Sequence, residues 1–325
     1  MDILGLDIGK TSFDAHLLGS AGSQNASFPN TQAGFEQLRA WLARLLPAPE
    51  QLHACMEATG NYGLDLAAFL VAEDITVSIV NPRQIKAFGD SELSRNKTDP
   101  LDAALIARFC RAHAPPAWTP PLAHMRILRE MVRRCAALKG MRTQEINRQK
   151  AGFISQAVQS SIGRVQAHIQ HEIDALTAEI RGLLAADDTL QGNFDLLRSI
   201  PGIGEVTAAL LLAELPNIAE FTPKGLAAFT GLSPSERSSG TRQRSAGISR
   251  IGNVALRSAL YLCALSARRH NPRLRQFVDR LQQAGKPNKV ILVAVARKLL
   301  VMAHAVIRTQ QPFMAEPPDQ AMALA

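Results

Sequence analysis

The chain begins with short apolar runs whose length is typical of β-strands. Residues 2–8 and 13–18 predict neighbouring strands around a turn at Gly9-Lys10-Thr11, and a third strand is expected near 24–28. Two further strands are expected at 51–57 and 75–80, the second of which is rich in β-branched residues.

Between and after these strands, the apolar residues recur with helical spacing. Helices are expected at 32–46, 62–73 and 99–113, and Asn81-Pro82 is expected to end the last strand. Strands that alternate with helices predict an α/β domain over residues 1–121, with a mixed sheet that starts antiparallel.

A stretch without proline follows from residue 122 to 188, and its apolar residues recur every three or four positions, as in Ile127, Met131 and Leu138. This pattern predicts a helical hairpin or coiled coil over 122–190, used as a spacer or for self-association into a dimer or tetramer. Beyond it, we expect an all-α domain at 191–310 and a disordered tail at 311–325.

Charge is distributed unevenly along the chain, whose net charge is +8. Residues 191–325 hold 17 basic and 8 acidic side chains, and the segment from Arg237 to Lys298 contains 14 basic residues and the single acid Asp279. Such a basic segment favours binding to a polyanion such as DNA or RNA, because each phosphate that it neutralises releases bound counterions. A surface that is merely solvated normally carries both basic and acidic side chains. A second basic cluster is equally compatible with a solvated face and with one that faces phosphates: Arg126, Arg129, Arg133 and Arg134.

Other features exclude whole classes of protein. No apolar run approaches the ~20 residues of a membrane helix, and the start MDILGLDIGK lacks the basic leader of a signal peptide. The four cysteines have no CxxC spacing, which argues against a zinc site. We therefore expect a cytoplasmic, nucleoid-associated bacterial protein with no membrane partner.

Acidic residues stand where the active-site acids of an α/β sheet usually lie. Asp7 interrupts the apolar first strand, which is costly unless its charge is paired or bound to a metal ion. Glu57 ends another apolar strand, and Asp99 and Asp102 share one face at a helix start because they are three residues apart.

Each acid also has a simpler explanation. Asp7 can be a turn residue and Glu57 the exposed end of a strand, while Asp99, Pro100 and Asp102 together are typical of a helix N-terminus. In combination, the four acids can hold hard cations such as Mg²⁺ or Mn²⁺, and phosphodiester chemistry commonly uses two ions about 3.5–4 Å apart. A nucleotide-binding loop at Leu4 to Thr11 is disfavoured, because leucine stands where a P-loop requires glycine. The phosphate loop of actin-like sugar kinases is a further alternative, but the chain has no second copy of it.

Two segments of the C-terminal half suggest contact with phosphates. The turn from Pro201 to Gly204 precedes an apolar helix, as in a helix-hairpin-helix, and its glycines let backbone N–H groups approach DNA. Ser239 lies in a Gly- and Ser-rich loop beside arginines such as Arg237 and Arg242. A serine there can act as a nucleophile towards a phosphodiester, although spacing alone favours a loop that only holds phosphates.

Together, several motifs resemble, in the same order, the DEDD transposases of the bacterial insertion-sequence family IS110. They are GLDIGK, MEATGNY, VNPRQIKAFGDSELSRNKTDPLDA, IPGIGEVTAALLLAEL, GLSPSERSSG and ISRIGNVALRSALY, and they cover residues 3 to about 300. The resemblance implies a RuvC-like (RNase H-like) fold for the first domain. It also implies a metal-binding quartet of Asp7, Glu57, Asp99 and Asp102, and a nucleophile at Ser239, with Ser238 adjacent to it. A further implication is a bridge RNA, encoded by the element, that pairs with donor and target DNA.

We therefore expect a transposase or recombinase that cuts and rejoins double-stranded DNA with two Mg²⁺ or Mn²⁺ ions and a covalent phosphoserine. One alternative is a Holliday-junction-resolvase-like nuclease that only cuts, with Ser239 as a phosphate ligand. Another is a non-catalytic protein that binds DNA or RNA. The residues expected to contact nucleic acid are Lys10, Arg95, Lys97, Gly202, Gly204, Arg237, Arg242, Arg244, Arg250 and Arg257.

Overall fold

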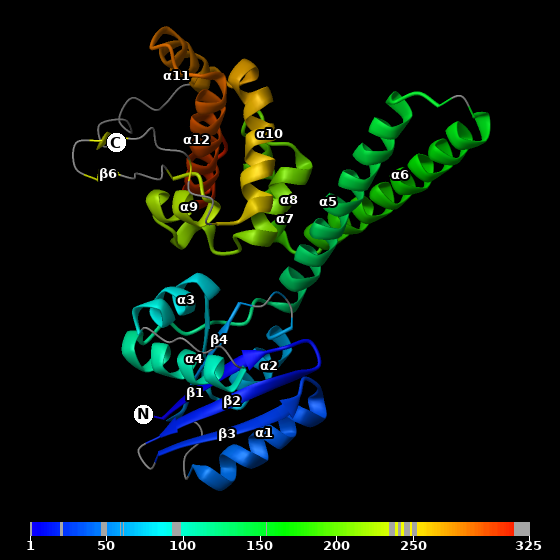
Figure 1. Ribbon diagram of the computed structural model, residues 1–325. Coiled ribbons are helices and arrows are strands. Elements are labelled where there is room, and N and C mark those ends of the chain that lie inside the picture. The colour runs from blue at the N-terminus through cyan, green and yellow to red at the C-terminus, as the bar shows by residue number, and fades with distance from the viewer. Residues whose placement is uncertain are drawn as a thin grey trace. The chain divides into compact units, whose positions relative to one another are not determined.

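The computed structural model divides into two compact units, Met1–Pro120 and Pro121–Ala325, each of which is described by itself (Figure 1). The structure describes all residues except 1, 20–21, 47–50, 59, 61, 93–98, 154, 234–237, 240–241, 244–247, 249–251 and 315–325.

The first unit is built on a five-stranded mixed sheet in the order β3-β2-β1-β4-β5. The antiparallel part comprises β1 (Ile3–Ile8), β2 (Ser12–Gly19) and β3 (Gly22–Pro29), while β4 (His53–Glu57) and β5 (Thr76–Val80) continue the sheet in parallel with β1. The predicted mixed α/β sheet with an antiparallel start is confirmed.

Helices cover both faces of this sheet. Leu4, Leu6 and Phe13 belong to a core that includes residues of α1 (Gln32–Leu45) and α2 (Leu64–Ala72). On the opposite face, Ile3, Cys55 and Val80 share a core with α3 (Pro82–Ser91) and α4 (Asp99–His113). Successive strand residues point to opposite faces, so the alternation in the sequence divides them between two cores.

Helix α3 corrects one expectation from the sequence. Asn81-Pro82 does end β5, as predicted, but it also begins a helix at once: the Asn81 side chain accepts a hydrogen bond from the Arg83 N–H at 2.9 Å, and Pro82 is the first helical residue. Asparagine before proline satisfies the requirements of a helix N-terminus as well as those of a turn.

The second unit is helical and has one continuous core. Its elements are α5 (Ala123–Lys150), α6 (Gln156–Ala185), α7 (Asp188–Arg198), α8 (Glu205–Glu214), the short 3₁₀ helix η2 (Ile218–Glu220), α9 (Pro223–Thr230), β6 (Ser238–Ser239), β7 (Arg242–Gln243), α10 (Val254–His270), α11 (Pro272–Gln283) and α12 (Asn288–Thr309). The hairpin of α5 and α6 extends away from the other helices of this unit (Figure 1). Buried residues Leu128 of α5, Leu211 of α8 and Leu299 of α12 nevertheless belong to the same hydrophobic cluster.

By length and composition alone, one helix in the described part of the chain, α12, is apolar enough to cross a membrane. More than half of its apolar window is buried, however, and it packs against α10 in the core of the second unit. Arg297 and Lys298 also interrupt its apolar sequence. These features are those of a core helix.

Helix α4 lies so close to β1 that only glycine fits at the contact. A Cβ at Gly5 would lie 2.6 Å from the backbone nitrogen of Ala107 and would also overlap the Ala103 carbonyl oxygen. Gly5→Ala should therefore push α4 away from the sheet and lower the free energy of unfolding by ~1–3 kcal/mol. Chemical denaturation of the purified protein measures this loss.

Gly140→Ala on α5 is the matched control, because a Cβ there has no heavy atom within 4 Å. It should stabilise the protein by ~0.5–1 kcal/mol, since alanine loses less conformational entropy than glycine in a helix. Equal effects of the two substitutions would contradict the close contact at Gly5.

Candidate active site

Two predicted acids lie side by side at the carboxyl edge of the sheet. Leu6 of β1 pairs with Met56 of β4 in the parallel ladder, so Asp7 and Glu57 form the next pair. Parallel strands lie about 4.8 Å apart, and paired residues point to the same face. Both side chains are half-buried, and both make contacts with their surroundings.

Helix α4 brings the third and fourth acids toward the same edge. Its C-terminal part is near the start of β4, since Cys110 and Cys55 share a buried cluster, and its Ala103 and Ala107 contact Gly5. Cys110 also interacts with His53, the first residue of β4, so we infer that the opposite end of the helix, where Asp99 and Asp102 stand, lies toward the carboxyl edge.

The acids of α4 can be related to the face of the helix that is buried. Ala103, Ile106 and Cys110 are buried against the sheet. Asp102 is four residues before Ile106, so its position continues the buried face of the helix. Asp102 is half-buried, and the side chain of Asp99 lies outside the described part of the structure.

The donor chemistry fits a hard divalent cation, because Mg²⁺ and Mn²⁺ prefer carboxylate oxygens. Within the described residues, no three or more His, Cys, Asp or Glu side chains are gathered closely enough to hold an ion. Asp7 and Glu57 occupy neighbouring strand positions, Asp102 is not gathered with them, and the side chain of Asp99 lies outside the described residues, so the metal-binding quartet stays a prediction.

The structure adds one acid that the sequence interpretation missed. Asp14 of β2 lies directly opposite Asp7 in the antiparallel ladder, on the same face, and is half-buried. Like charges directly opposite each other destabilise a strand pair unless a cation separates them. The available signal was the alternation of Phe13, Ala15 and Leu17, which places Asp14 on the face opposite to theirs.

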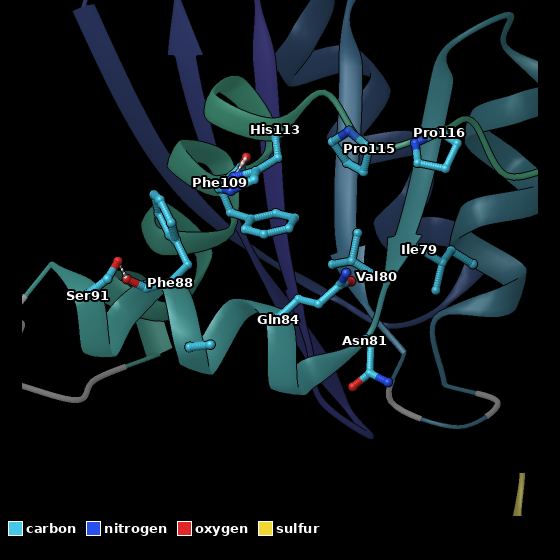
Figure 2. Close-up of a pocket in the computed structure, with 11 residues that line it drawn as sticks. Ile79, Val80, Asn81, Gln84, Phe88, Ser91, Phe109, His113, Pro115 and Pro116 are labelled. Carbon is cyan, nitrogen blue, oxygen red and sulfur yellow. Dashed lines mark hydrogen bonds between the residues drawn. The ribbon is translucent and has the colours of Figure 1, made fainter. Parts of the chain in front are cut away.

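A cavity of the first unit is separate from these acids. It has a volume of about 670 Å³ and lies between α3, the C-terminal part of α4 and the end of β5. Figure 2 shows Phe88, Phe109 and His113 on one side of it and Pro115 and Pro116 on the other. Among the described residues, no carboxylate lines this cavity.

In the second unit, the segment with the candidate nucleophile contains a short hairpin. Ser239 of β6 pairs with Arg242 of β7, and Ser238 pairs with Gln243. Only two residues separate Ser239 from Arg242 in the chain, so Ser239 stands next to the hairpin turn. The predicted contacts Arg95, Lys97, Arg237, Arg244 and Arg250 lie outside the described residues, as do the side chains of Ser238, Ser239 and Arg242.

Two glycines close the base of this loop, which we call the serine loop (residues 232–251). Gly252 has φ +133°, and a Cβ there would lie 2.5 Å from both the Gly231 nitrogen and the Phe229 carbonyl oxygen. The Asn253 N–H donates to that same Phe229 oxygen at 2.8 Å. The two ends of the loop are therefore in contact.

A buried carboxylate holds this base to the helical hairpin. Glu214, at the end of α8, accepts hydrogen bonds from Arg133 Nε of α5 at 2.6 Å and from Asn253 Nδ2 at 2.8 Å. Arg129 Nε donates to the neighbouring Ala213 carbonyl oxygen at 3.0 Å. Of the basic cluster on α5, Arg129 and Arg133 thus bind groups of the protein itself.

The environment of Glu214 favours its charged form. Burial acts to raise the pKa of this carboxyl group, but the hydrogen bond and charge of Arg133, together with Asn253 and Arg129, outweigh burial and hold the pKa below its usual value. The same hydrogen bond raises the pKa of Arg133.

The predicted hairpin turn between α7 and α8 is present, but it packs against the protein. Gly202 has φ +106°, and a Cβ there would lie 2.5 Å from the Ala267 Cβ of α10, so packing alone requires glycine. Gly204 is exposed, and the adjacent Glu205 pairs with Arg181 of α6. Contact between this turn and DNA stays a prediction.

The remaining predicted nucleic-acid contacts are Lys10 and Arg257. Lys10 is exposed in the turn that follows β1, at the same sheet edge as Asp7. Arg257 of α10 is half-buried and donates through Nη1 to the Thr230 carbonyl oxygen at 3.3 Å.

Replacing Glu214 should destabilise the second unit. Glu214→Gln removes the charge that Arg133 faces, and since Arg133 is half-exposed, we expect a loss of about 2–3 kcal/mol, or roughly 5–10 °C in Tm. The folded-state pKa of Glu214 lies below the ordinary value of 4.5, so the stabilisation is present above that pH and is lost as pH falls through the folded pKa.

Thermal unfolding of both proteins between pH 3 and pH 7 measures this difference. Glu220→Gln, at an exposed acid of η2, is the control and should leave Tm unchanged. A difference between Glu214→Gln and the parent protein that stays constant down to pH 3 would contradict the proposed ion pair.

Both units match models of known transposase families. Residues 4–153 match a DEDD family named for IS110 and described as "Transposase", and residues 194–279 match the "Transposase IS116/IS110/IS902 family". The first match spans the four predicted acids, and the second spans the α7–α8 turn and Ser239.

Individual relatives are similar over nearly the whole chain. The pilin gene-inverting proteins of Moraxella bovis and Moraxella lacunata are each 36% identical over 316 residues, which cover 95% of this chain and 97% of theirs. The transposase for insertion sequence element IS1328 of Yersinia enterocolitica is 25% identical over 342 residues, 94% of this chain and 96% of its own.

Proposed function

The chain belongs to the IS110 family of transposases and recombinases, which act on DNA, and from that premise we propose how it cuts and rejoins its substrate. In this proposal, a RuvC-like domain holds two divalent cations through Asp7, Glu57, Asp99 and Asp102. Ser239 is the nucleophile, and the reaction passes through a covalent phosphoserine.

One observation carries the proposal: Asp7 and Glu57 occupy neighbouring positions at the carboxyl edge of the sheet, on the face that α4 covers. Without a cation, carboxylates at such positions would repel one another, and burial would add to the cost. Mg²⁺ or Mn²⁺, when bound there, would offset negative charge on the scissile phosphate.

The covalent step balances without any further reactant. The Ser239 Oγ–phosphorus bond forms as the bond from phosphorus to the oxygen of the leaving strand breaks. The proton that the serine hydroxyl loses is matched by the proton that the new DNA hydroxyl gains. Because one phosphodiester replaces another, the step conserves the bond energy needed for rejoining.

The hairpin of the serine loop supports this role. Ser239 stands next to the hairpin turn and is paired with Arg242 across it, so an arginine is adjacent to the proposed nucleophile. Arginine stabilises charge that develops on an attacked phosphate.

The relatives favour a rejoining enzyme over a nuclease that only cuts. Two of them bear a name that describes inversion of a pilin gene, and inversion requires that every cut strand is joined again. A resolvase-like nuclease, in which Ser239 only holds phosphate, would release hydrolysed ends and form no adduct.

We also propose that a bridge RNA encoded by the element guides the protein, and that it acts as a dimer or tetramer on the nucleoid in the cytoplasm. The cationic second unit suits RNA and DNA alike. The α5–α6 hairpin exposes the apolar residues Met141, Phe153, Val158 and Val165, which suit self-association.

The covalent intermediate is tested by trapping a protein–DNA adduct on a denaturing gel, with the full chain, its element RNA, cognate DNA and Mg²⁺. Ser239→Ala should lower adduct formation by roughly 10³-fold or more, because the attacking oxygen is removed. Asp7→Asn should lower it by roughly 10²-fold or more, because metal binding and charge stabilisation are lost.

Ser238→Ala and Asp90→Asn are the matched controls, and both should keep the adduct. Asp90 is an exposed acid on α3 of the first unit, away from the sheet edge. An adduct that survives Ser239→Ala and disappears in Ser238→Ala would move the nucleophile by one residue. Cleavage without any adduct would favour the resolvase-like alternative.

Self-association through the hairpin is tested on α6. Val158 and Val165 are 40% and 43% exposed and lie seven residues apart, on one helix face. The double substitution Val158→Glu with Val165→Glu should shift the sedimentation coefficient toward that of a monomer, because charges oppose burial of this face.

The double substitution Ser160→Glu with Ala167→Glu adds the same charges, with the same spacing, on another exposed face of α6. It should leave sedimentation unchanged. If both double variants sediment as the parent protein does, the hairpin face is not the interface.

A further inference from the structure

A cavity of about 580 Å³ opens at the base of the serine loop. Its walls come from three places: Leu232 and Ile248 of the loop, α10, and the N-terminal part of α12. The apolar part includes Leu262, which is 64% exposed, and Val293. The cavity thus lies at the base of the loop that contains Ser239.

The polar groups of this cavity are cationic or neutral. Arg257 and Lys289 line it, together with Ser258 and Tyr261, and none of the described lining residues is an acid. Within the described residues, no carboxylate forms an ion pair with Lys289. The hydrogen bond from Arg257 to the carbonyl oxygen of the buried Thr230 fixes the guanidinium base while its other N–H groups can still donate.

We propose that this cavity binds one unstacked nucleotide of the nucleic-acid strand on which the serine loop acts. The base would lie on Leu262 and Val293 beside the Tyr261 ring, and Arg257 and Lys289 would bind the flanking phosphates. The assignment rests on the proposed function, since it requires a nucleic-acid substrate at the serine loop.

Size and chemistry both fit this occupant. Cavities of about 300–1,000 Å³ with an apolar lining and a few placed polar groups are typical of small-molecule sites, and a nucleotide is of that size. An aromatic ring and aliphatic side chains accept the face of any base, while cations bind its phosphates. Protein pockets do accept a nucleotide turned out of a duplex, as in enzymes that act on a base.

A protein partner is the competing occupant, because Leu262 and the neighbouring Val290 expose apolar surface. Two features favour the nucleotide: the cationic rim without an acid, and the continuity of the cavity with the serine loop. The segment from Arg237 to Lys298, which contributes most of the lining, has 14 basic residues and one acid.

The test blocks the cavity with a bulky side chain. Ser258 and Ser266 are both exposed on α10, eight residues apart, but only Ser258 lines the cavity. Ser258→Trp in the full-length protein should weaken binding of a fluorescent 20-nucleotide single strand at least tenfold. Ser266→Trp, the matched control, should change the Kd by less than twofold. Each is measured with DNA and with RNA of the same base sequence, and the tighter of the two identifies the source of the nucleotide.

Two further measurements separate this role from a structural one. In a duplex with one 2-aminopurine placed in turn at each position, the parent protein and Ser266→Trp should raise the fluorescence at one position by unstacking, and Ser258→Trp should not. Lys289→Gln should leave Tm unchanged and reduce the slope of log K against log salt for single strands by about 0.7, the change expected for one lost phosphate contact.

The outcomes distinguish the two levels of the proposal. If the parent protein binds neither DNA nor RNA, the proposed function itself fails. If the parent protein binds, and Ser258→Trp and Ser266→Trp bind as it does, only the nucleotide site is overturned. A cavity that serves a protein partner would give this second result.

Discussion

The geometry of the first unit depends on one close approach between backbones. Gly5 lacks the side chain that would hold α4 away from β1, so Ala103 and Ala107 rest directly on the strand. Because the helix is held at this distance and in this direction, its first turn ends beside the carboxyl edge of the sheet. Asp7 and Glu57 stand at that edge, and a small residue at position 5 is therefore as important to the candidate site as the acids themselves.

A buried carboxylate has the corresponding role in the second unit. Glu214 is almost fully enclosed, and such a charge is stable only with partners. Its partners come from distant parts of the chain: Arg133 from the helical hairpin, and Asn253 from the end of the serine loop. These hydrogen bonds join the base of the loop to α5.

The two units differ in the charged groups that they carry. The first concentrates carboxylates, which suit cations, and the second concentrates arginine and lysine, which suit phosphates. The family relationship accounts for both, because an enzyme that acts on DNA must bind a polyanion and also offset the charge of the phosphate that reacts. The cavity beside the serine loop extends this division, since its apolar floor and cationic rim match the two parts of a nucleotide.

The sequence by itself determined the elements whose signal is local. Alternating apolar residues gave five strands within a residue or two, and the long stretch without proline gave the α5–α6 hairpin. It also identified Asp7, Glu57, Asp99 and Asp102 as candidates, because each stands at a strand or a helix start where an acid is unusual or functional. The cationic C-terminal half was visible in the same way.

Only the tertiary structure decided which residues meet. The periodicity of apolar residues does not give the order of the strands. The observed sheet places Asp14 opposite Asp7 and Glu57 on the other side of Asp7. The sequence left the role of Arg129 and Arg133 open, and the packing of α5 on α8 assigned them to Ala213 and Glu214. Gly202 looked like a residue that approaches phosphate, yet its neighbour is Ala267. Apart from the pair of Asp7 and Asp14, which the β1–β2 hairpin joins, the deciding contacts are between residues distant in the chain, and local sequence carries no information about such contacts.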